Sequence, residues 1–179
     1  MTRLFTALEI PAAVKTHLSL LKGGLPGARW IDPENYHLTL RFIGDIDGRM
    51  ADEVADALDR VYRPPFGLTL SGLDCFSSGR APHSLIARVE PTPALVDLQA
   101  EHERILQRIG LPAEGRRYVP HVTIARLRGT TSADVALWLA AHGDFRVPRF
   151  DVDRFVLYSS RASVGGGPYL IEEAYPLAA

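Results

Sequence analysis

The sequence predicts an α+β fold built from two similar lobes, each with an antiparallel β-sheet and helices on its outer face. Segments in which apolar and polar residues alternate, as in strands, are interspersed with segments of helical periodicity along all 179 residues. A motif, His37-Leu38-Thr39-Leu40, returns 84 positions later as His121-Val122-Thr123-Ile124, and a predicted helix follows each copy. We therefore expect an internal duplication, with residues 1–179 forming one bilobal domain whose two sheets face a central cleft.

The first half of the chain places the first motif strand between two predicted helices. Its elements are, in chain order, a strand over 3–10, a helix over 11–22, a short extended segment at 30–31, the motif strand over 36–44 and a helix over 49–62. Pro11 suits the first turn of a helix, and the pair Gly23-Gly24 ends it. Pro64-Pro65 terminates the second helix, because proline lacks the amide that a helix interior requires.

The second half repeats this order around the second motif. Its elements are strands over 66–76 and 84–89, a helix over 92–109, the second motif strand over 118–128, a helix over 132–141, and closing strands over 145–159 and 169–175. Thr92 is a typical N-cap for the long helix, and Gly110 is a typical stop. We expect a flexible turn at Gly165-Gly166-Gly167, between the closing strands.

Composition narrows the class of protein. The chain is 46% hydrophobic, which supports a real core, and it contains no apolar run long enough to span a membrane. The single cysteine, Cys75, excludes an internal disulfide, and the N-terminus lacks the apolar core of a signal peptide, so we expect a cytoplasmic protein. A net charge of −1 argues against a protein that coats long nucleic acids, although it permits recognition of one terminus or one phosphate.

The two motifs point to chemistry because of their residue types and spacing. With six histidines and nine threonines, about 0.3 His-x-Thr matches are expected by chance, so two with the same apolar filling are uncommon. In a strand, residues i and i+2 share a face, so His37 should point with Thr39 and His121 with Thr123. If both faces line one cleft, a neutral imidazole can accept a proton while a protonated one donates, and the hydroxyls can hold an anionic phosphate. This chemistry needs no metal ion.

These motifs and their flanks resemble the two-histidine phosphoesterase superfamily, specifically its RNA 2′,3′-cyclic phosphodiesterase branch, also called the 2′-5′ RNA ligase family. The resemblance extends over nearly the whole chain and includes the opening 3–11, the run 37–44, the run 120–126 and the glycine-rich turn before Tyr169. It is loosest between residues 77 and 90, where related proteins often carry an aromatic residue. The nucleoside preference therefore stays open.

The resemblance implies hydrolysis of an RNA 2′,3′-cyclic phosphate end to a 2′-phosphomonoester, without cofactor, metal, membrane or obligate protein partner. His37 would be the proton donor and His121 the proton acceptor, while Thr39 and Thr123 would hold the phosphate. The symmetry of the motifs leaves the acid and base assignment open from sequence alone. We expect a monomer, since the second lobe already supplies the partner that each motif needs.

Two arginines close to the motifs are further candidates for substrate binding. By strand alternation Arg41 shares a face with His37 and Thr39, whereas Arg126 points away from the second motif unless a twist or bulge returns it. Arg116-Arg117 is an adjacent basic pair before the second motif strand, for which surface solvation is weighed against contact with an RNA backbone.

Other residues of a chemical type have ordinary structural interpretations. Tyr36, Phe42 and Tyr118 flank the motifs and suit either stacking on a terminal base or a core position. His102 lies on the apolar side of its helix and is expected to be packed in the core, while His83 is a less favoured third catalytic histidine.

Two alternatives to hydrolysis use the same cleft. One is 2′-5′ ligation, in which an RNA 5′-hydroxyl replaces water as the nucleophile; the large excess of water favours hydrolysis unless the RNA ends are held together. The other is a non-catalytic module that binds RNA ends, which would be indicated by a missing motif residue. None is missing here.

Overall fold

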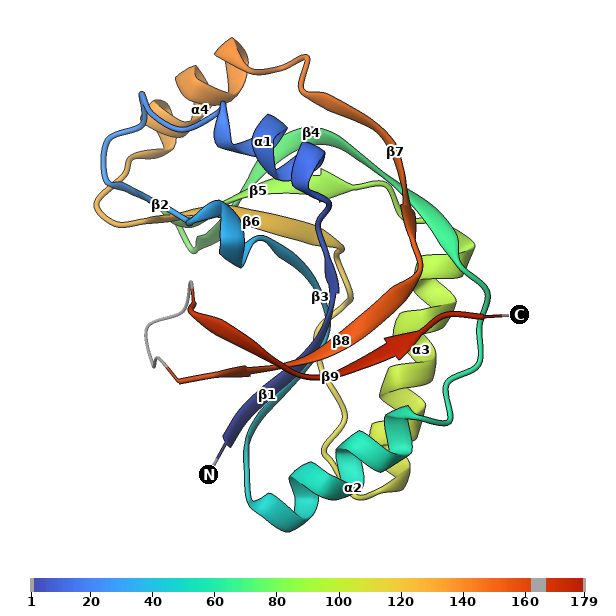
Figure 1. Ribbon diagram of the computed structural model, residues 1–179. Helices are drawn as coiled ribbons and strands as arrows, with labels where there is room; N and C mark the ends of the chain where they lie inside the picture. Colours follow the sequence, from blue (N-terminus) through green and yellow to red (C-terminus); the bar gives the residue numbers. More distant parts are fainter. Residues whose placement is uncertain (1, 162–166, 179) are drawn as a thin grey trace.

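A computed structural model describes residues 2–161 and 167–178, so the predicted turn at Gly165 and Gly166 lies outside the described residues. The helices are α1 (Ala12–Ser19), α2 (Gly48–Leu58), α3 (Pro93–Arg108) and α4 (Ser132–Ala141), with a short 3-10 helix, η1, at Pro33–Asn35 (Figure 1). The strands are β1 (Thr2–Glu9), β2 (Ala28–Trp30), β3 (His37–Ile46), β4 (Phe66–Ser78), β5 (Ala81–Val89), β6 (His121–Leu127), β7 (Arg146–Val152), β8 (Arg154–Ser160) and β9 (Tyr169–Pro176).

The strands form an antiparallel sheet in the order β7-β4-β5-β6-β3-β1-β8-β9, with β2 alongside β6. The sheet is narrowest between the two motif strands, where the single pair Leu38–Val122 joins β3 to β6. We call β3, β1, β8 and β9 the first lobe, and β2, β4, β5, β6 and β7 the second lobe. The predicted α+β fold with antiparallel strands is confirmed, whereas the two expected sheets are joined through this one pair into a single sheet.

Each lobe draws elements from both halves of the chain. Strands β8 and β9 come from the C-terminal end yet extend the first lobe, whereas β4 and β5 pair beside β6 in the second lobe. Helices α2 and α3 contact each other and pack on β1 and β3, while α4 packs on β4 and β5 near α1 (Figure 1). The closing strand expected over 145–159 is divided at Asp153 into β7 and β8, where the chain crosses between lobes.

The apolar faces of the motif strands are part of one continuous core. Leu38, Leu40, Val122 and Ile124 are all buried, with at most 2% of their surface exposed. Leu98 and Leu106 of α3 are buried in the same core, on the helix face that the sequence predicts. Burial of each such side chain contributes about 1.5–3 kcal/mol. The aliphatic positions of both motifs therefore fix the strands, and the polar positions are left to face the other way.

Helix termini follow the signals in the sequence. The Thr92 hydroxyl accepts a hydrogen bond from the Leu95 amide at 3.3 Å, as predicted for the N-cap of α3. Thr131 and Asp134 form a reciprocal capping box at the start of α4. Helix α2 ends at Leu58, four residues earlier than the sequence pattern suggests. No helix in the described part of the chain is long and apolar enough to cross a membrane.

Candidate active site

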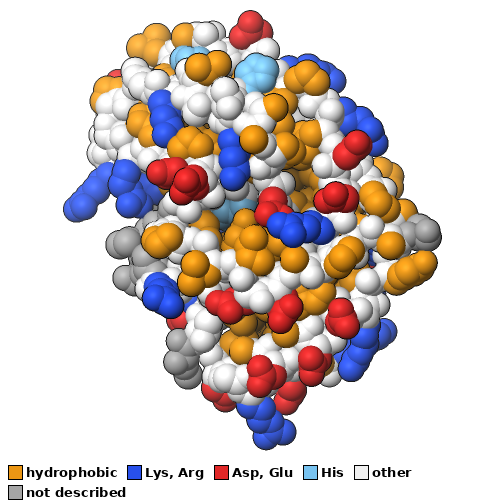
Figure 2. Space-filling model, in the orientation of Figure 1, with side chains coloured by type: hydrophobic (Ala, Val, Ile, Leu, Met, Phe, Trp, Pro, Cys, Tyr) orange, Lys and Arg blue, Asp and Glu red, His pale blue; other side chains and the backbone are white. Residues whose placement is uncertain are grey.

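The polar faces of the two motif strands meet in one cleft of about 360 Å³. His37 and Thr39 line it from β3, and His121 and Thr123 line it from β6. Histidine side chains are visible in the recess between the upper and lower parts of the molecule, with basic side chains near its rim (Figure 2). Four side chains expected to act together thus border one space, supplied by two strands 84 residues apart in sequence.

Both imidazoles are oriented by the same local contact. His37 Nδ1 lies 2.9 Å from the carbonyl oxygen of Asn35, and His121 Nδ1 lies 2.7 Å from that of Val119, in each case two residues earlier. A carbonyl oxygen can only accept, so each Nδ1 carries the proton and each neutral ring has its lone pair on Nε2. The Thr39 hydroxyl, 3.1 Å from His37 Nε2, then donates to that lone pair. The backbone therefore selects the tautomer that leaves Nε2 available for proton transfer.

The free site favours neutral imidazoles. The pKa of His37 is lowered to about 4, chiefly by burial, with smaller contributions from Arg126 and from His121 when it is protonated, while the hydrogen bond to the Asn35 carbonyl opposes the shift. Burial and the charge of Arg126 also lower the pKa of His121, against the effect of the Val119 carbonyl. At neutral pH both rings are therefore uncharged, and an anion bound between them would raise both pKa values.

Aromatic side chains surround the two histidines differently. The His37 ring centroid lies 5.0 Å from those of Phe5 and Tyr169, within a small cluster on the cleft side of the first lobe. The His121 ring has an edge-to-face contact with Phe76 at 4.8 Å. Phe76 lies near the end of β4 and lines the cleft beside His121. It immediately precedes the stretch 77–90, in which the family resemblance leads one to expect an aromatic residue.

Arg126 faces the cleft because β6 contains a bulge. Strand β5 pairs Leu85 with Ala125 and Ile86 with Thr123, so Ile124 is the extra residue. A bulge reverses the alternation of side chains beyond it, which returns Arg126 to the face of His121 and Thr123. Arg126 lines the cleft and donates from Nη1 to the Ser84 hydroxyl at 2.9 Å. The twist or bulge considered from the sequence is thus present.

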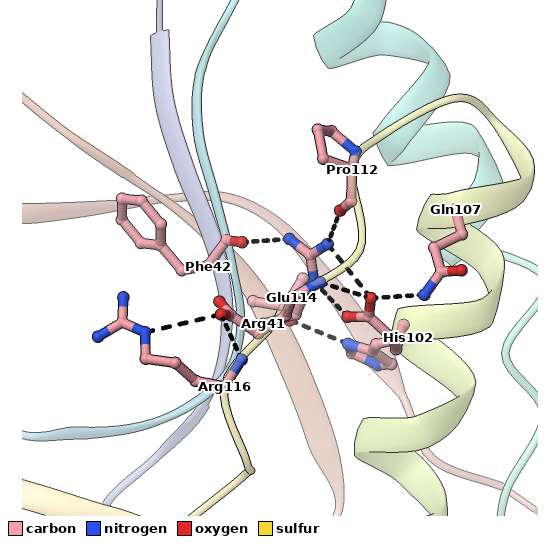
Figure 3. A network of polar contacts seen from close by, with 9 residues as sticks. Arg41, Phe42, His102, Gln107, Pro112, Glu114 and Arg116 are labelled. Atoms are coloured by element: carbon pink, nitrogen blue, oxygen red, sulfur yellow. Dashed lines mark hydrogen bonds and ion pairs between the residues drawn. The ribbon is translucent and has the colours of Figure 1, made fainter.

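The same irregularity in β3 removes Arg41 from the cleft. Strand β1 pairs Thr6 with Arg41 and Ala7 with Thr39, so Leu40 is the extra residue. Contrary to the sequence prediction, Arg41 points away from His37 and is only 6% exposed. Its guanidinium binds the Glu103 carboxylate of α3 and the carbonyl oxygens of Phe42 and Pro112 (Figure 3).

These contacts give Arg41 a structural role in place of the substrate contact that the sequence suggested. Burial raises the pKa of Glu103, but the hydrogen bonds from Arg41, the Glu114 amide and Gln107 outweigh it, and the pKa lies below its ordinary value. Phe42 takes the cleft-facing position, with 50% of its surface exposed. Figure 3 shows the Phe42 ring on the other side of the strand from the Arg41 guanidinium.

The other histidines and tyrosines mostly have structural environments. His102 is buried with its Nδ1 2.9 Å from the Thr6 hydroxyl, which confirms the predicted core position, and burial lowers its pKa to about 3. His83 lines the cleft and contacts the Ser84 hydroxyl at 2.9 Å. Tyr36 is buried, and the Tyr118 hydroxyl donates to the Thr39 carbonyl oxygen, so the motif strand is braced at this point.

Several residues that line the cleft were not predicted from the sequence. Arg3 and Phe5 reach it from β1, and Tyr169 and Ser160 from β9 and β8. Alternation in β1 places Arg3 and Phe5 on one face, but no local pattern links that face to the motifs before the pairing of β1 with β3 is known. Among residues 2–161 and 167–178, no group of three or more His, Cys, Asp or Glu is placed to hold a metal ion.

Comparison with known proteins identifies the class of protein. The sequence profile described as "LigT like Phosphoesterase" matches the chain twice, over residues 8–87 and 86–169. Each match contains one His-x-Thr motif, and together they cover most of the chain, which confirms the internal duplication. The chain belongs to the LigT-like phosphoesterase family.

Two individual relatives carry the name of one particular activity within this family. The chain is 33% identical over 178 residues to an RNA 2′,3′-cyclic phosphodiesterase of Thermotoga maritima, covering 94% of this chain and 92% of that one. It is 29% identical over 173 residues to the protein of the same name from Aquifex aeolicus, covering 94% and 90%.

Solved structures share the fold. The protein TT0787 of Thermus thermophilus superposes with a TM-score of 0.82 at 22% identity, over 98% of this chain and 97% of that one. Escherichia coli LigT complexed with 3′-AMP superposes with a TM-score of 0.76 at 22% identity, over 99% of both chains.

Proposed function

We propose that this chain hydrolyses RNA ends bearing a 2′,3′-cyclic phosphate and produces 2′-phosphomonoesters. The observation that carries the proposal is the convergence of two imidazoles, each with Nδ1 held by a backbone carbonyl, on one cleft. An acid and a base on opposite sides of a phosphorus atom are what in-line displacement requires. The activity named for the relatives from Thermotoga maritima and Aquifex aeolicus supports the same reaction.

In this reaction a water molecule attacks the cyclic phosphate. His121 Nε2 accepts a proton from the water as the new P–O bond forms, and His37 Nε2 donates a proton to the 3′ oxygen as the P–O3′ bond breaks. One water is consumed, and a 3′-hydroxyl and a 2′-phosphate result. Each proton transfer is worth roughly 10²–10⁴-fold in rate. The two histidines end with exchanged protonation states, and exchange with solvent restores them.

The cleft residues also supply charge for the phosphate. The hydroxyls of Thr39 and Thr123 and the guanidinium of Arg126 lie on the faces that carry the two imidazoles, where non-bridging oxygens would sit. The bound anion raises the low pKa of His37, so this imidazole acquires its proton when the substrate arrives. The same anion also raises the pKa of His121, so the assignment of His37 as acid and His121 as base rests on the family resemblance and not on the order of the pKa values in the free site.

We further propose that the chain acts as one bilobal domain over 1–179, as a cytoplasmic monomer. Each lobe contributes one histidine to the cleft, and strands from both halves of the sequence complete each lobe. Neither half contains a complete site, so the smallest active unit is the whole chain. No cofactor, metal or protein partner enters the proposed steps.

The proposal is tested with a short RNA ending in a 2′,3′-cyclic phosphate, in the presence of EDTA. We expect wild type to form a 2′-phosphate, identified by ³¹P NMR of the product, and His37→Ala or His121→Ala to lose about 10²–10⁴-fold in kcat/KM. His17→Ala, which removes an exposed histidine outside the cleft, is the matched control and should retain activity.

Other outcomes point to other functions. A 3′-phosphate product would contradict the assigned regiochemistry. Formation of a 2′-5′ linkage when an RNA with a 5′-hydroxyl is added would favour ligation. Tight binding of the cyclic end without turnover would indicate a non-catalytic end-binding module.

A further inference from the structure

A second cavity, of about 700 Å³, opens directly from the catalytic cleft. The two spaces share seven lining residues, among them Phe42, Phe76 and Arg116. A terminal cyclic phosphate needs only the region between the two histidines. The second cavity extends away from them toward the segment that follows α3, so the combined site is larger than one nucleotide end requires.

The second cavity is strongly basic. Four arginines line it (Arg41, Arg116, Arg117 and Arg126) against one carboxylate, Glu114, in a chain whose net charge is −1. Arg126 already serves the cleft, and Arg41 is neutralised by Glu103. The charge that remains for a ligand in the second cavity therefore belongs to Arg117 and to Arg116, whose largely exposed guanidinium has only a long contact of 3.7 Å with Glu114, and it suits an anion other than the reacting phosphate.

Arg116 is held in place by a chain of contacts that begins in the core. The buried pair Arg41–Glu103 anchors the Glu114 amide, which donates to Glu103 Oε1 at 2.9 Å. Glu114 Oε1 in turn accepts from the Arg116 amide at 3.1 Å and lies 3.7 Å from Arg116 Nε. The Arg116 side chain is 92% exposed and extends on the same side as the Phe42 ring (Figure 3). Its position is thus fixed at the backbone, while its guanidinium is open to a ligand.

Aromatic surface accompanies this charge. Phe42 lines both spaces with half of its surface exposed, because the bulge at Leu40 turns it toward the cleft. Phe76 lines both spaces and packs against His121. An exposed ring beside arginines is the combination with which proteins bind single-stranded RNA, by base stacking and phosphate contact.

We propose that the second cavity binds the nucleotide on the 5′ side of the cyclic end. Arg116 and Arg117 contact the phosphodiester that joins the last two nucleotides, and Phe42 offers a stacking surface to the penultimate base. This inference rests on the proposed hydrolysis and adds that the enzyme selects RNA ends over mononucleoside cyclic phosphates. The chemistry proposed for the two histidines is unaffected by it.

Three substrates test the proposal with the wild-type protein. They are a mononucleoside 2′,3′-cyclic phosphate, a dinucleotide with the same cyclic end, and that dinucleotide with an uncharged methylphosphonate linkage. We expect kcat/KM to be at least about tenfold higher for the dinucleotide than for the mononucleoside, and the methylphosphonate to lose most of this gain. The salt dependence of log kcat/KM should also be shallower for the methylphosphonate, by a slope of about 0.7.

A pair of charge-matched double variants assigns the effect to its residues. Arg116→Ala/Arg117→Ala should bring the dinucleotide-to-mononucleoside ratio of kcat/KM close to that of the methylphosphonate. Arg104→Ala/Arg108→Ala removes the same charge from exposed positions of α3 that line neither space, and should keep the wild-type ratio.

Each remaining outcome has a distinct meaning. Hydrolysis of all three substrates with equal kcat/KM would overturn the second subsite and leave the proposed function intact. An unchanged ratio in the Arg116→Ala/Arg117→Ala protein would also overturn it. Hydrolysis of none of them would contradict the proposed function itself.

Discussion

The two motif strands have the same backbone but different side chains beyond the motif. In both, the fourth motif residue, Leu40 or Ile124, is the extra residue of a bulge, so side chains beyond it change face. In β3 this buries Arg41 and exposes Phe42; in β6 it buries Ala125 and brings Arg126 into the cleft. The duplication therefore preserved the geometry of the strand, while the two lobes acquired different tasks, one aromatic and one cationic.

The surroundings of the two histidines also differ between the lobes. His37 is enclosed by Phe5, Tyr169 and the Thr39 hydroxyl, whereas His121 meets a single aromatic ring, Phe76, among the described residues. Arg126 lowers the pKa of both, although it belongs to the second strand. A site that is symmetric in sequence is thus asymmetric in environment, and the asymmetry is what can distinguish an acid from a base.

The largest expected effect tests whether the two strands act as one unit. His37→Ala and His121→Ala should each lose about 10²–10⁴-fold in kcat/KM, and the double variant should lose little more than the worse single variant, because either loss already breaks the paired proton transfers. Steady-state kinetics on the cyclic RNA end, with urea unfolding to show that each variant folds, provide the measurement. Fully multiplicative losses would mean that the histidines act independently.

The next effect concerns the arginine that the bulge buries. Arg41→Met should lower the free energy of unfolding by about 3–5 kcal/mol, because it leaves the Glu103 carboxylate without its buried partner. Arg126→Met is the matched control: its guanidinium faces the cleft, so catalysis should fall with little change in stability. Urea unfolding curves for both variants make the comparison. A stability loss confined to Arg126→Met would reverse the two assigned roles.

These arginines also show where sequence reasoning succeeds and where it stops. The period of two correctly placed His37, Thr39, His121 and Thr123, since those residues precede the bulge. It failed at Arg41 because a bulge residue has no local signature when its side chain, Leu40, is an ordinary buried aliphatic. The same periodicity left open which face of β6 carries the Arg126 side chain, because that face depends on how β6 pairs with β5. The orientations of Arg41 and Arg126 both depend on pairing with a distant strand, which the sequence of one strand alone does not determine.

The same limit applies to the rest of the fold. Helix starts, such as the cap at Thr92, depend on neighbouring residues and were predicted. The division of residues 145–159 at Asp153 was not predicted, because it depends on strand pairing: β7 pairs with β4 in the second lobe, and β8 pairs with β1 in the first lobe. The contribution of Phe5 and Tyr169 to the wall around His37 has the same origin, because β1 and β9 reach the cleft only through the sheet.

The smallest expected effect is the difference between the pKa values of His37 and His121 in the protein without ligand, measured by NMR titration. Ring ¹⁵N–¹H spectra should show both neutral rings protonated at Nδ1, with His37 titrating at about 4 and His121 below its ordinary value of about 6.5. Arg126→Gln should raise both pKa values, since removing a positive charge favours the imidazolium, while Arg104→Gln should leave them unchanged.

The direction of these pKa shifts also fixes the pH dependence of stability. The unfolded chain binds a proton at His37 near pH 6.5, and the folded one only near pH 4, so between these values the unfolded state holds more protons. The His37 contribution to folding is therefore present above pH 6.5 and is lost as the pH falls through 4. Equal titration of both histidines near 6.5 would show that the two environments are equivalent, and the acid and base would then be set by the substrate alone.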